Sequence, residues 1–400
     1  MNFLRAFAFL WICIPYIVLG QVRPLKIGDR VGFKEPLAVI NWRDSTLSLD
    51  NVNKDLIILD FFTTSCTSCI EAMPKNNKLQ QMFAERLQII PVGIESKERI
   101  EKLLADNRYM KDLKLPLVVE DKVLTKIFPH QGVPHVVWIY KGRVAAITAG
   151  DMMTEKNIKD LLGGNDIHRW PMKDDFYEDH ERDSLSFSSG LYSRLLPYVN
   201  GAPLSYQVDT IGNQVRYRMT NATVVSAFLY LYSQIQQLPL MKKERIKLDV
   251  NNLYEFENLD SIPESIWVQK NAFSYESTWP LLMDHKDRIQ AVIKDLSNRL
   301  NLGVDLTPQK SAIWLVKSGK SGNDKLQNGK SPTDLKTWIT MLEIFNTSFP
   351  PIEIDSGLSD RVISTDAVND FESLKKVLKG NGLDIKKTER EILSLVIRSH

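Results

Sequence analysis

The sequence predicts an α/β domain, with a mixed central sheet and helices on both of its faces, followed by a C-terminal α+β region. Three observations lead to this prediction. Apolar strands alternate with helical patterns over residues 56–107, a tight hairpin follows at 133–148, and the chain then becomes acidic and polar from about residue 171. Alternation of strand and helix implies parallel pairing through right-handed crossovers, and the hairpin adds an antiparallel edge. We expect a first domain at 21–165, a linker at 166–190 and a second domain at 191–400.

The overall composition is that of an ordinary globular protein. The chain has 400 residues, of which 43% are hydrophobic and 25% are charged, and this length allows more than one core. The 51 Lys and Arg residues nearly balance the 49 Asp and Glu residues, for a net charge of +2. A chain so close to neutral gives no electrostatic reason to expect nucleic acid as a partner.

The first 20 residues, MNFLRAFAFLWICIPYIVLG, have the layout of a secretory signal peptide. Arg5 precedes an apolar block, and Val18 and Gly20 are small residues placed before a cleavage point. The alternative is an uncleaved membrane anchor, but Pro15 interrupts the block, which is also shorter than the ~18 residues of a spanning helix. We therefore expect residues 1–20 to be removed and the protein to be exported.

The first strand of the domain is expected at Leu56–Phe62, where a continuous apolar run is interrupted only by Asp60. Such runs are typical of strands buried on both faces of a parallel sheet. A helix at 67–84, a second buried strand at 87–94 and a helix at 96–107 follow. Ser96 is a suitable N-cap for the last of these helices.

The remaining elements of the domain are a short strand at 115–121, the hairpin at 133–148 and a closing helix at 154–164 that ends in glycine. Gly142 stands in the turn of the hairpin, where a positive φ is needed. In the second domain we expect helices at 223–237, 285–300, 334–344 and 366–379, and strands at 246–250, 311–316 and 393–397.

Cysteine usage points to a reactive pair. The chain has three cysteines, and removal of the signal peptide would take Cys13 and leave Cys66 and Cys69. Exported proteins normally carry structural disulfides at long spacings, so one short-range pair is better explained by reactivity. Cys66 is expected where a buried strand meets a helix N-terminus, whose free N–H groups and dipole stabilise a thiolate. Cys69, one turn further on, is expected to be less exposed and can attack a mixed disulfide that Cys66 forms.

Two other interpretations of the pair are half of a zinc site and two inert buried side chains. A tetrahedral zinc site needs two further Cys or His ligands. The six histidines form no paired ligand motif; they are His130, His135, His168, His180, His285 and His400. We therefore expect no metal, and no cofactor other than the redox-active disulfide itself.

The segments LDFFTTSCTSCIEAMP and GVPHVVWIYKGRVAAITAG together resemble the thioredoxin superfamily. The additional helix and strand at 96–119 are similar to those of the TlpA/ResA-like branch of this superfamily, whose members are exported thiol-disulfide oxidoreductases. This likeness implies a role similar to that in cytochrome c biogenesis. The resemblance covers about residues 24–164. It implies a thioredoxin fold and reduction or exchange of protein disulfides through Cys66 and Cys69. It also implies a protein substrate with a disulfide or thiols, a membrane-linked electron donor, and a location in the periplasm or cell envelope of a bacterium.

Three further positions match this superfamily. Asp60 matches a buried acid whose pKa should be raised and which passes a proton to or from Cys69. Pro74 matches the proline that kinks the active-site helix. Val133-Pro134 matches a cis-proline that faces the two sulfurs and lets residue 133 pair with an extended substrate segment.

Other positions depart from the superfamily. Ser65 stands where many relatives have Trp, and Thr67 and Ser68 replace Gly-Pro or Pro-Pro between the cysteines, so no relative's reduction potential can be carried over. His135 replaces the usual Thr after the cis-proline, where it either alters thiol acidity or has a packing or surface role. These departures leave a non-catalytic thioredoxin-like scaffold of the cell envelope as the main alternative. A peroxiredoxin is less compatible, because Leu59 stands where the proline of its motif belongs.

Residues 191–400 contain no catalytic constellation. The segments YRMTNATVVSAFLYLY, SAIWLVKSGKSGNDKLQ, PPIEIDSGLSDRV and LKKVLKGNGLDIKKTEREILSLVI resemble an uncharacterised domain of exported proteins of soil bacteria. That domain is itself similar to the short βαβ modules of secretin and TonB-receptor N-termini, which bind protein partners. The resemblance implies an interaction module that binds an envelope protein.

Overall fold

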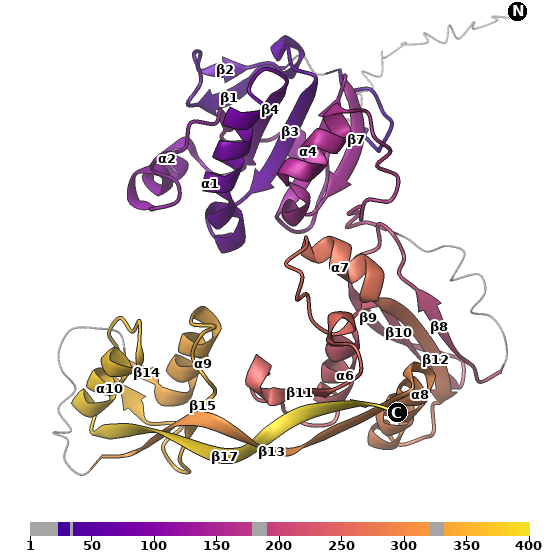
Figure 1. Cartoon of the computed structure of the whole chain (residues 1–400), viewed down its shortest axis with the longest axis vertical. Coiled ribbons are helices and arrows are strands. Elements are labelled where there is room, and N and C mark those ends of the chain that lie inside the picture. The colour runs from indigo at the N-terminus through magenta and orange to yellow at the C-terminus, as the bar shows by residue number, and fades with distance from the viewer. Residues whose placement is uncertain (1–22, 33–34, 178–189, 320–331) are drawn as a thin grey trace, which may run out of the picture. The chain divides into compact units, whose positions relative to one another are not determined.

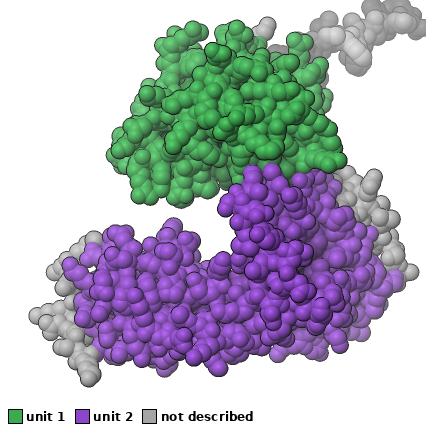
Figure 2. Space-filling view, viewed as in Figure 1, with its two compact units in different colours: residues 1–176 green, residues 177–400 purple. Residues whose placement is uncertain are grey.

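The computed structural model describes residues 23–32, 35–177, 190–319 and 332–400 (Figure 1). The chain divides into two compact units, Met1–Phe176 and Tyr177–His400 (Figure 2). The expected signal peptide at 1–20, with Cys13, lies outside the described residues. Within the described ranges, no helix combines the length and the apolar character that a membrane span requires.

The first unit is built on a seven-stranded sheet in the order β2-β1-β5-β4-β3-β6-β7 (Figure 1). β3 is parallel to β4 and antiparallel to β6, and β6 is antiparallel to β7. This is the mixed sheet with an antiparallel end that the sequence predicts. Its strands are β1 (Leu37–Ile40), β2 (Thr46–Leu47), β3 (Leu56–Phe62), β4 (Leu87–Gly93), β5 (Leu117–Val118), β6 (His135–Tyr140) and β7 (Arg143–Thr148).

Helices cover both faces of this sheet. The helix α1 (Thr67–Met82) packs on the face that carries Asp60, and α4 (Glu155–Leu162) lies over the same face (Figure 1). On the opposite face, α3 (Leu124–Ile127) joins a hydrophobic cluster with Ile57, Leu59 and other buried residues of the sheet. The predicted thioredoxin fold is therefore confirmed for this unit. It also contains α2 (Lys97–Asp106) and the 3-10 helices η1 (Leu49–Asn51) and η2 (Gly150–Met152).

Local signals explain where several elements begin and turn. The hydroxyl of Ser96 accepts a hydrogen bond from the N–H group of Arg99 at the start of α2, so Ser96 is the N-cap that the sequence predicts. Lys141 and Gly142 have φ values of 48° and 74° in the turn between β6 and β7, as a two-residue hairpin turn requires. β1 and β2 were not predicted, because they contain only four and two residues.

The segment 166–190, expected to be a linker, differs from that expectation in its first part. Trp170 is buried, and its ring packs edge-on against that of Trp138 at 5.1 Å between centroids. The N–H group of Lys173 donates to the carbonyl of Ile147 in β7 at 2.9 Å. Residues up to Phe176 therefore belong to the first unit, while 178–189 lie outside the described residues.

The second unit is the α+β region that the sequence predicts. Its sheets have the orders β8-β12-β10-β9, β11-β17-β13-β15 and β14-β16. The strands are β8 (Ser193–Pro197), β9 (Ser205–Ile211), β10 (Gln214–Ala222), β11 (Ile246–Asp249), β12 (Phe273–Pro280), β13 (Leu302–Ser318), β14 (Thr333–Asp334), β15 (Ile352–Ile354), β16 (Val362–Ile363) and β17 (Leu383–Ser399). The helices are α6 (Val224–Ser233), α7 (Glu264–Asn271), α8 (His285–Leu300), α9 (Leu335–Phe345) and α10 (Phe371–Gly380), with short 3-10 turns η3 (Lys243–Arg245) and η4 (Leu253–Glu255).

The helices expected in this region correspond to α6, α8, α9 and α10, and the expected strands lie in β11, β13 and β17. The sheet β8-β12-β10-β9 was not predicted. Its central strands place charged side chains such as Arg216 and Glu276 in buried positions. Charged residues are almost never fully buried unless paired. Segments that contain them are therefore expected on the surface and not as buried strands of a sheet.

Candidate active site

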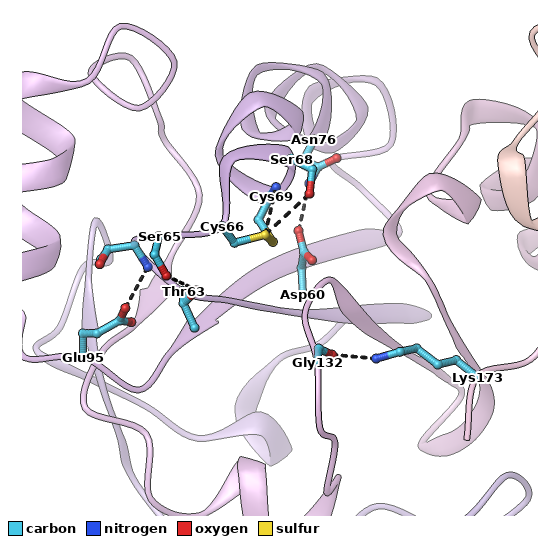
Figure 3. The surroundings of a disulfide bond; sticks show 11 residues. Asp60, Thr63, Ser65, Cys66, Ser68, Cys69, Asn76, Glu95, Gly132 and Lys173 are labelled. Atoms are coloured by element: carbon cyan, nitrogen blue, oxygen red, sulfur yellow. Dashed lines mark hydrogen bonds between the residues drawn. A yellow bond between two sulfur atoms is a disulfide. The ribbon is translucent and has the colours of Figure 1, made fainter. Parts of the chain in front are cut away.

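The two cysteines lie where β3 gives way to α1. Cys66 is the N-cap of α1, and its Sγ accepts a hydrogen bond from the N–H group of Cys69 at 3.3 Å (Figure 3). The two side chains form a disulfide, with 5.3 Å between the Cα atoms. Cys66 is partly exposed, whereas Cys69 is only 2% exposed. The sequence-based expectation that Cys69 is the less accessible of the two is confirmed.

The residues between the cysteines form the first turn of α1. Thr67 and Ser68 are both exposed, and the Oγ atom of Ser68 lies 3.6 Å from Sγ of Cys66 (Figure 3). At this position the hydroxyl can donate a hydrogen bond to a thiolate of Cys66. Pro74 lies inside α1 with its side chain exposed, and the helix continues through it from Thr67 to Met82.

The loop that precedes Cys66 is held by the end of β4 and the start of α2. The N–H group of Thr64 donates to Oε1 of Glu95 at 2.7 Å (Figure 3). The Thr64 hydroxyl accepts from Nε of Arg99 at 2.9 Å, and the hydroxyls of Thr63 and Ser65 lie 3.2 Å apart. These contacts fix the backbone from which Cys66 projects, and the sequence did not predict them.

Asp60 lies in the middle of β3 and is 3% exposed. Its Oδ2 atom accepts a hydrogen bond from Nδ2 of Asn76 in α1 at 2.9 Å (Figure 3). Burial raises the pKa of Asp60 to about 7, against the opposing effects of the Lys75 ammonium group and of the Asn76 hydrogen bond. The predicted rise in its pKa is therefore confirmed, and the carboxyl group can exchange a proton near neutral pH.

Asn76 is a residue of the site that the sequence analysis missed. It is 1% exposed, and its Oδ1 atom is buried without a hydrogen-bond partner among the described residues. A signal for it exists in the sequence, since residues seven apart share a helix face and Asn76 comes seven residues after Cys69. Asn76 is therefore a polar residue on the helix face that also carries Cys69, and such a residue is a candidate hydrogen-bond donor to the buried carboxyl group of Asp60.

The peptide bond between Val133 and Pro134 is cis, as the resemblance implied. β3 and β6 pair Phe61 with His135 and Asp60 with Val136. β6 begins at His135, beside the last residues of β3. Pro134 therefore lies immediately before the start of β6, next to the end of β3. The chain leaves β3 at this same edge to form the cysteine loop, so the fold brings the cysteines, Asp60 and Val133-Pro134 to one region.

His135 is buried beside a second histidine. Its ring stacks on that of His130 at 4.6 Å between centroids, and its Nδ1 atom lies 3.4 Å from Nζ of Lys173. Burial lowers the pKa of His135 to about 3, reinforced by the charges of Lys173 and His130 and opposed by that of Asp175. The imidazole is therefore neutral at physiological pH, and the surface role considered for it is wrong because the side chain is 2% exposed.

Among the residues that the structure describes, no group of three or more His, Cys, Asp and Glu side chains is arranged to hold a metal ion. A zinc site at Cys66 and Cys69 would need two further ligands, and the expectation that the pair binds no metal stays a prediction.

Comparisons with known proteins can be set beside this geometry. No family model matches the chain. Over 116 residues it is 28% identical to the thioredoxin-like protein YneN of Bacillus subtilis (strain 168), a match that covers 29% of this chain and 68% of that protein. The chain is thus similar to a thioredoxin-like protein over part of its length, in agreement with the fold of the first unit.

Solved structures give matches of the same kind. A putative thiol:disulfide interchange protein DsbE from Chlorobium tepidum is 19% identical, with a TM-score of 0.29, and the match covers 35% of this chain and 94% of that one. The thioredoxin domain of a thiol-disulfide oxidoreductase from Bacteroides vulgatus is 16% identical, with a TM-score of 0.29 and coverage of 35% and 97%.

Proposed function

We propose that the protein is a thiol-disulfide oxidoreductase that reduces or exchanges protein disulfides through Cys66 and Cys69. The observation that carries the proposal is the joint placement of a disulfide at the N-terminus of α1 and a buried Asp60 whose pKa is about 7. A structural disulfide needs neither an accessible sulfur at a helix N-terminus nor a nearby group that can change protonation. A dithiol catalyst needs both.

In the reductive direction, the thiolate of Cys66 attacks one sulfur of a substrate disulfide. A mixed disulfide forms, and the first substrate sulfur leaves as a thiolate that takes up a proton. Asp60 accepts the proton of Cys69, and the resulting thiolate attacks Sγ of Cys66. The second substrate thiol is released, the Cys66–Cys69 disulfide forms, and two electrons have passed to the substrate. The same steps in the reverse order oxidise two substrate thiols and reduce the Cys66–Cys69 disulfide, and exchange of substrate disulfides combines the two directions with no net transfer of electrons.

The exposures of the two sulfurs support this order of events. Cys66 is partly exposed, so a substrate sulfur can reach it, whereas the burial of Cys69 keeps that thiol from attacking substrates directly. Val133 and Pro134 are also partly exposed. In the proposal, the backbone of Val133 pairs with an extended substrate segment, as in strand addition to a sheet edge.

The site of action and the partners belong to the same proposal. The signal-like segment at 1–20 supports export to the periplasm or cell envelope. Continued turnover as a reductase requires a dithiol protein that returns two electrons to the Cys66–Cys69 disulfide, and we propose a membrane-linked donor. Residues 191–400 would then bind an envelope protein.

The proposal is tested by replacing Cys69 with Ser in the exported full-length protein. Without the resolving thiol, the mixed disulfide between Cys66 and a substrate should persist, so we expect covalent adducts that disappear on treatment with reductant. The double variant Cys66→Ser/Cys69→Ser is the matched control and should trap nothing. Separation on non-reducing gels followed by mass spectrometry identifies the trapped proteins.

The main alternative is a thioredoxin-like scaffold without catalysis, which the unusual Ser65, Thr67 and Ser68 would suit. It predicts that Cys69→Ser traps no partner and that the wild-type protein reduces no protein disulfide. Both results together would reject the oxidoreductase. Labelling of free thiols in cells would show whether the pair is kept reduced or oxidised, and hence the direction of electron flow.

A further inference from the structure

The loop before the cis-proline is held from outside the predicted thioredoxin-like domain. We call residues 131–134 the cis-proline loop and residues 173–175 the strap. Oδ2 of Asp175 accepts hydrogen bonds from the N–H groups of Gln131 at 2.9 Å and Gly132 at 3.3 Å. Nζ of Lys173 donates to the carbonyl of Gly132 at 2.6 Å (Figure 3). Two side chains of the strap thus bind three backbone groups of the loop.

The strap is itself well anchored. Nζ of Lys173 also donates to Oδ2 of Asp175 at 2.9 Å, and the two side chains are 22% and 11% exposed. A pair this sheltered is less screened than a surface salt bridge, and its hydrogen bonds to the loop add to the attraction. The backbone of Lys173 is bonded to β7 through Ile147, so the strap has a fixed position from which to act.

Within the loop, residues 131–132 have little else to fix them. Gln131 and Gly132 are exposed, and a Cβ atom built on Gly132 would meet nothing within 4 Å. Packing therefore does not restrain this part of the backbone. An exposed glycine with free space around it has many accessible conformations, and hydrogen bonds from the strap select one of them.

We propose that Lys173 and Asp175 are positioning residues of the candidate active site, which hold residues 131–132 and thereby fix Val133-Pro134 for pairing with a substrate backbone. This inference rests on the proposed function and extends the functional unit beyond residue 165, into the segment that composition alone marks as a linker. Neither side chain touches the reacting sulfurs. Their removal should therefore weaken substrate binding and leave the chemistry of the disulfide itself unchanged.

Asp175→Asn in the full-length protein is the sharpest test, because the amide keeps the shape but loses the charge that binds two N–H groups. Asp174→Asn is the matched control, since Asp174 is exposed and accepts from the N–H group of Phe176 instead. We expect amide hydrogen exchange at Gln131 and Gly132 to become about tenfold faster in Asp175→Asn only. We also expect KM for a disulfide-bonded protein to rise about tenfold, with kcat within about twofold of wild type.

Lys173→Met adds a spectroscopic measurement. Lys173, His130 and Asp175 are the charged or titratable groups that act on His135. Loss of the Lys173 ammonium group leaves the Asp175 carboxylate, so the imidazole signal of His135 should titrate at a higher pH than in wild type. Lys173→Arg should keep KM near the wild-type value, because a guanidinium group can also donate to the carbonyl of Gly132.

Three results distinguish a failure of the positioning role from a failure of the proposed function. If the wild type reduces protein disulfides but Asp175→Asn and Asp174→Asn have the same KM, the positioning role is overturned. Unchanged exchange at Gln131 and Gly132 would overturn it as well. If the wild type reduces no disulfide, the proposed function fails, and hydrogen exchange alone decides whether the strap holds the loop. Rates with a small-molecule disulfide should equal wild type throughout, which shows that the variants are folded and that Cys66 is intact.

Discussion

Asp60 holds a carboxyl group inside a strand whose other residues are apolar and buried. An ionised carboxylate there has lost its hydration and gains only the attraction of the Lys75 charge and the Asn76 hydrogen bond. The protonated form avoids this cost. In the proposed reaction Asp60 exchanges a proton with Cys69, and a carboxyl group whose two forms are balanced near pH 7 suits that role.

The same burial makes Asp60 destabilising at high pH. Between pH 4 and 7 the folded protein keeps a proton that the unfolded chain has released, so stability falls as pH rises through this window. The pKa rise from 3.8 to about 7 corresponds to about 4 kcal/mol at about 1.4 kcal/mol per pKa unit. We therefore expect Asp60→Asn to stabilise the oxidised first unit at pH 9 by up to about 4 kcal/mol, and to have little effect near pH 4.

Urea unfolding at pH 4, 7 and 9 measures this difference. Asp112→Asn is a suitable control, because it replaces an exposed carboxyl group in the same unit and should change stability little at any pH. A variant Asp60→Asn that is no more stable than wild type at pH 9 would show that burial does not raise the pKa of this carboxyl group. Slower resolution of mixed disulfides in the same variant would connect the stability cost to function.

The cis-proline loop is also fixed from a second side, by η2, the 3-10 turn after β7. A Cβ atom on Gly150 would lie 2.8 Å from Cβ of Pro134 and 3.2 Å from its Cγ. Such contacts are too short, so the turn and the loop approach each other only because position 150 has no side chain. η2 and the strap thus hold opposite parts of one loop, one by packing and the other by hydrogen bonds.

We therefore expect Gly150→Ala to displace Pro134 and to destabilise the first unit by about 1–3 kcal/mol, as overpacking does. KM for a protein disulfide should rise with it. The matched control is Gly32→Ala, because a Cβ atom at Gly32 would meet nothing within 4 Å. Thermal unfolding and steady-state kinetics of both variants provide the comparison, and equal melting temperatures would contradict the packing argument.

Across the whole molecule, the elements that the sequence predicted best are those with strong local signals. β3 was predicted at its observed bounds from a continuous apolar run, and α8 from its helical pattern. β9 and β10 were missed because their alternation includes charged residues, some of them buried. Burial of charge depends on partners from other strands, such as the pairing of Arg216 with Asp209 at 3.0 Å, which a local pattern does not reveal.

In the candidate active site too, residues with a local signal were predicted, and residues that act across a long distance in the chain were not. Cys66 and Cys69 were predicted from their short spacing along the chain, and Asp60 from the resemblance that the segment around them carries. Lys173 and Asp175 were not, since they reach the cis-proline loop from about 40 residues further along the chain and stand in a segment without apolar periodicity. Their role is visible only when the fold brings the two segments together.

The division into two units leads to a prediction about the disulfide. The hydrophobic cluster around Ile57 and Leu59 contains residues of the first unit, and the clusters around Tyr275 and around Leu383 contain residues of the second. Closure of a four-residue loop by a disulfide stabilises by about 2 kcal/mol in the chain-entropy account. Reduction should therefore lower the melting temperature of the first unit by about 4–8 °C and leave that of the second unchanged.

Thermal unfolding with and without dithiothreitol, followed by calorimetry, tests this expectation, and hydrogen exchange of peptides assigns each transition to a unit. Reductant should have no effect on the double variant Cys66→Ser/Cys69→Ser, which controls for other actions of the reagent. One cooperative transition that shifts as a whole would mean that the two units unfold together. In that case the redox state of Cys66 and Cys69 would be coupled to the stability of residues 191–400, and a partner of that region could sense it.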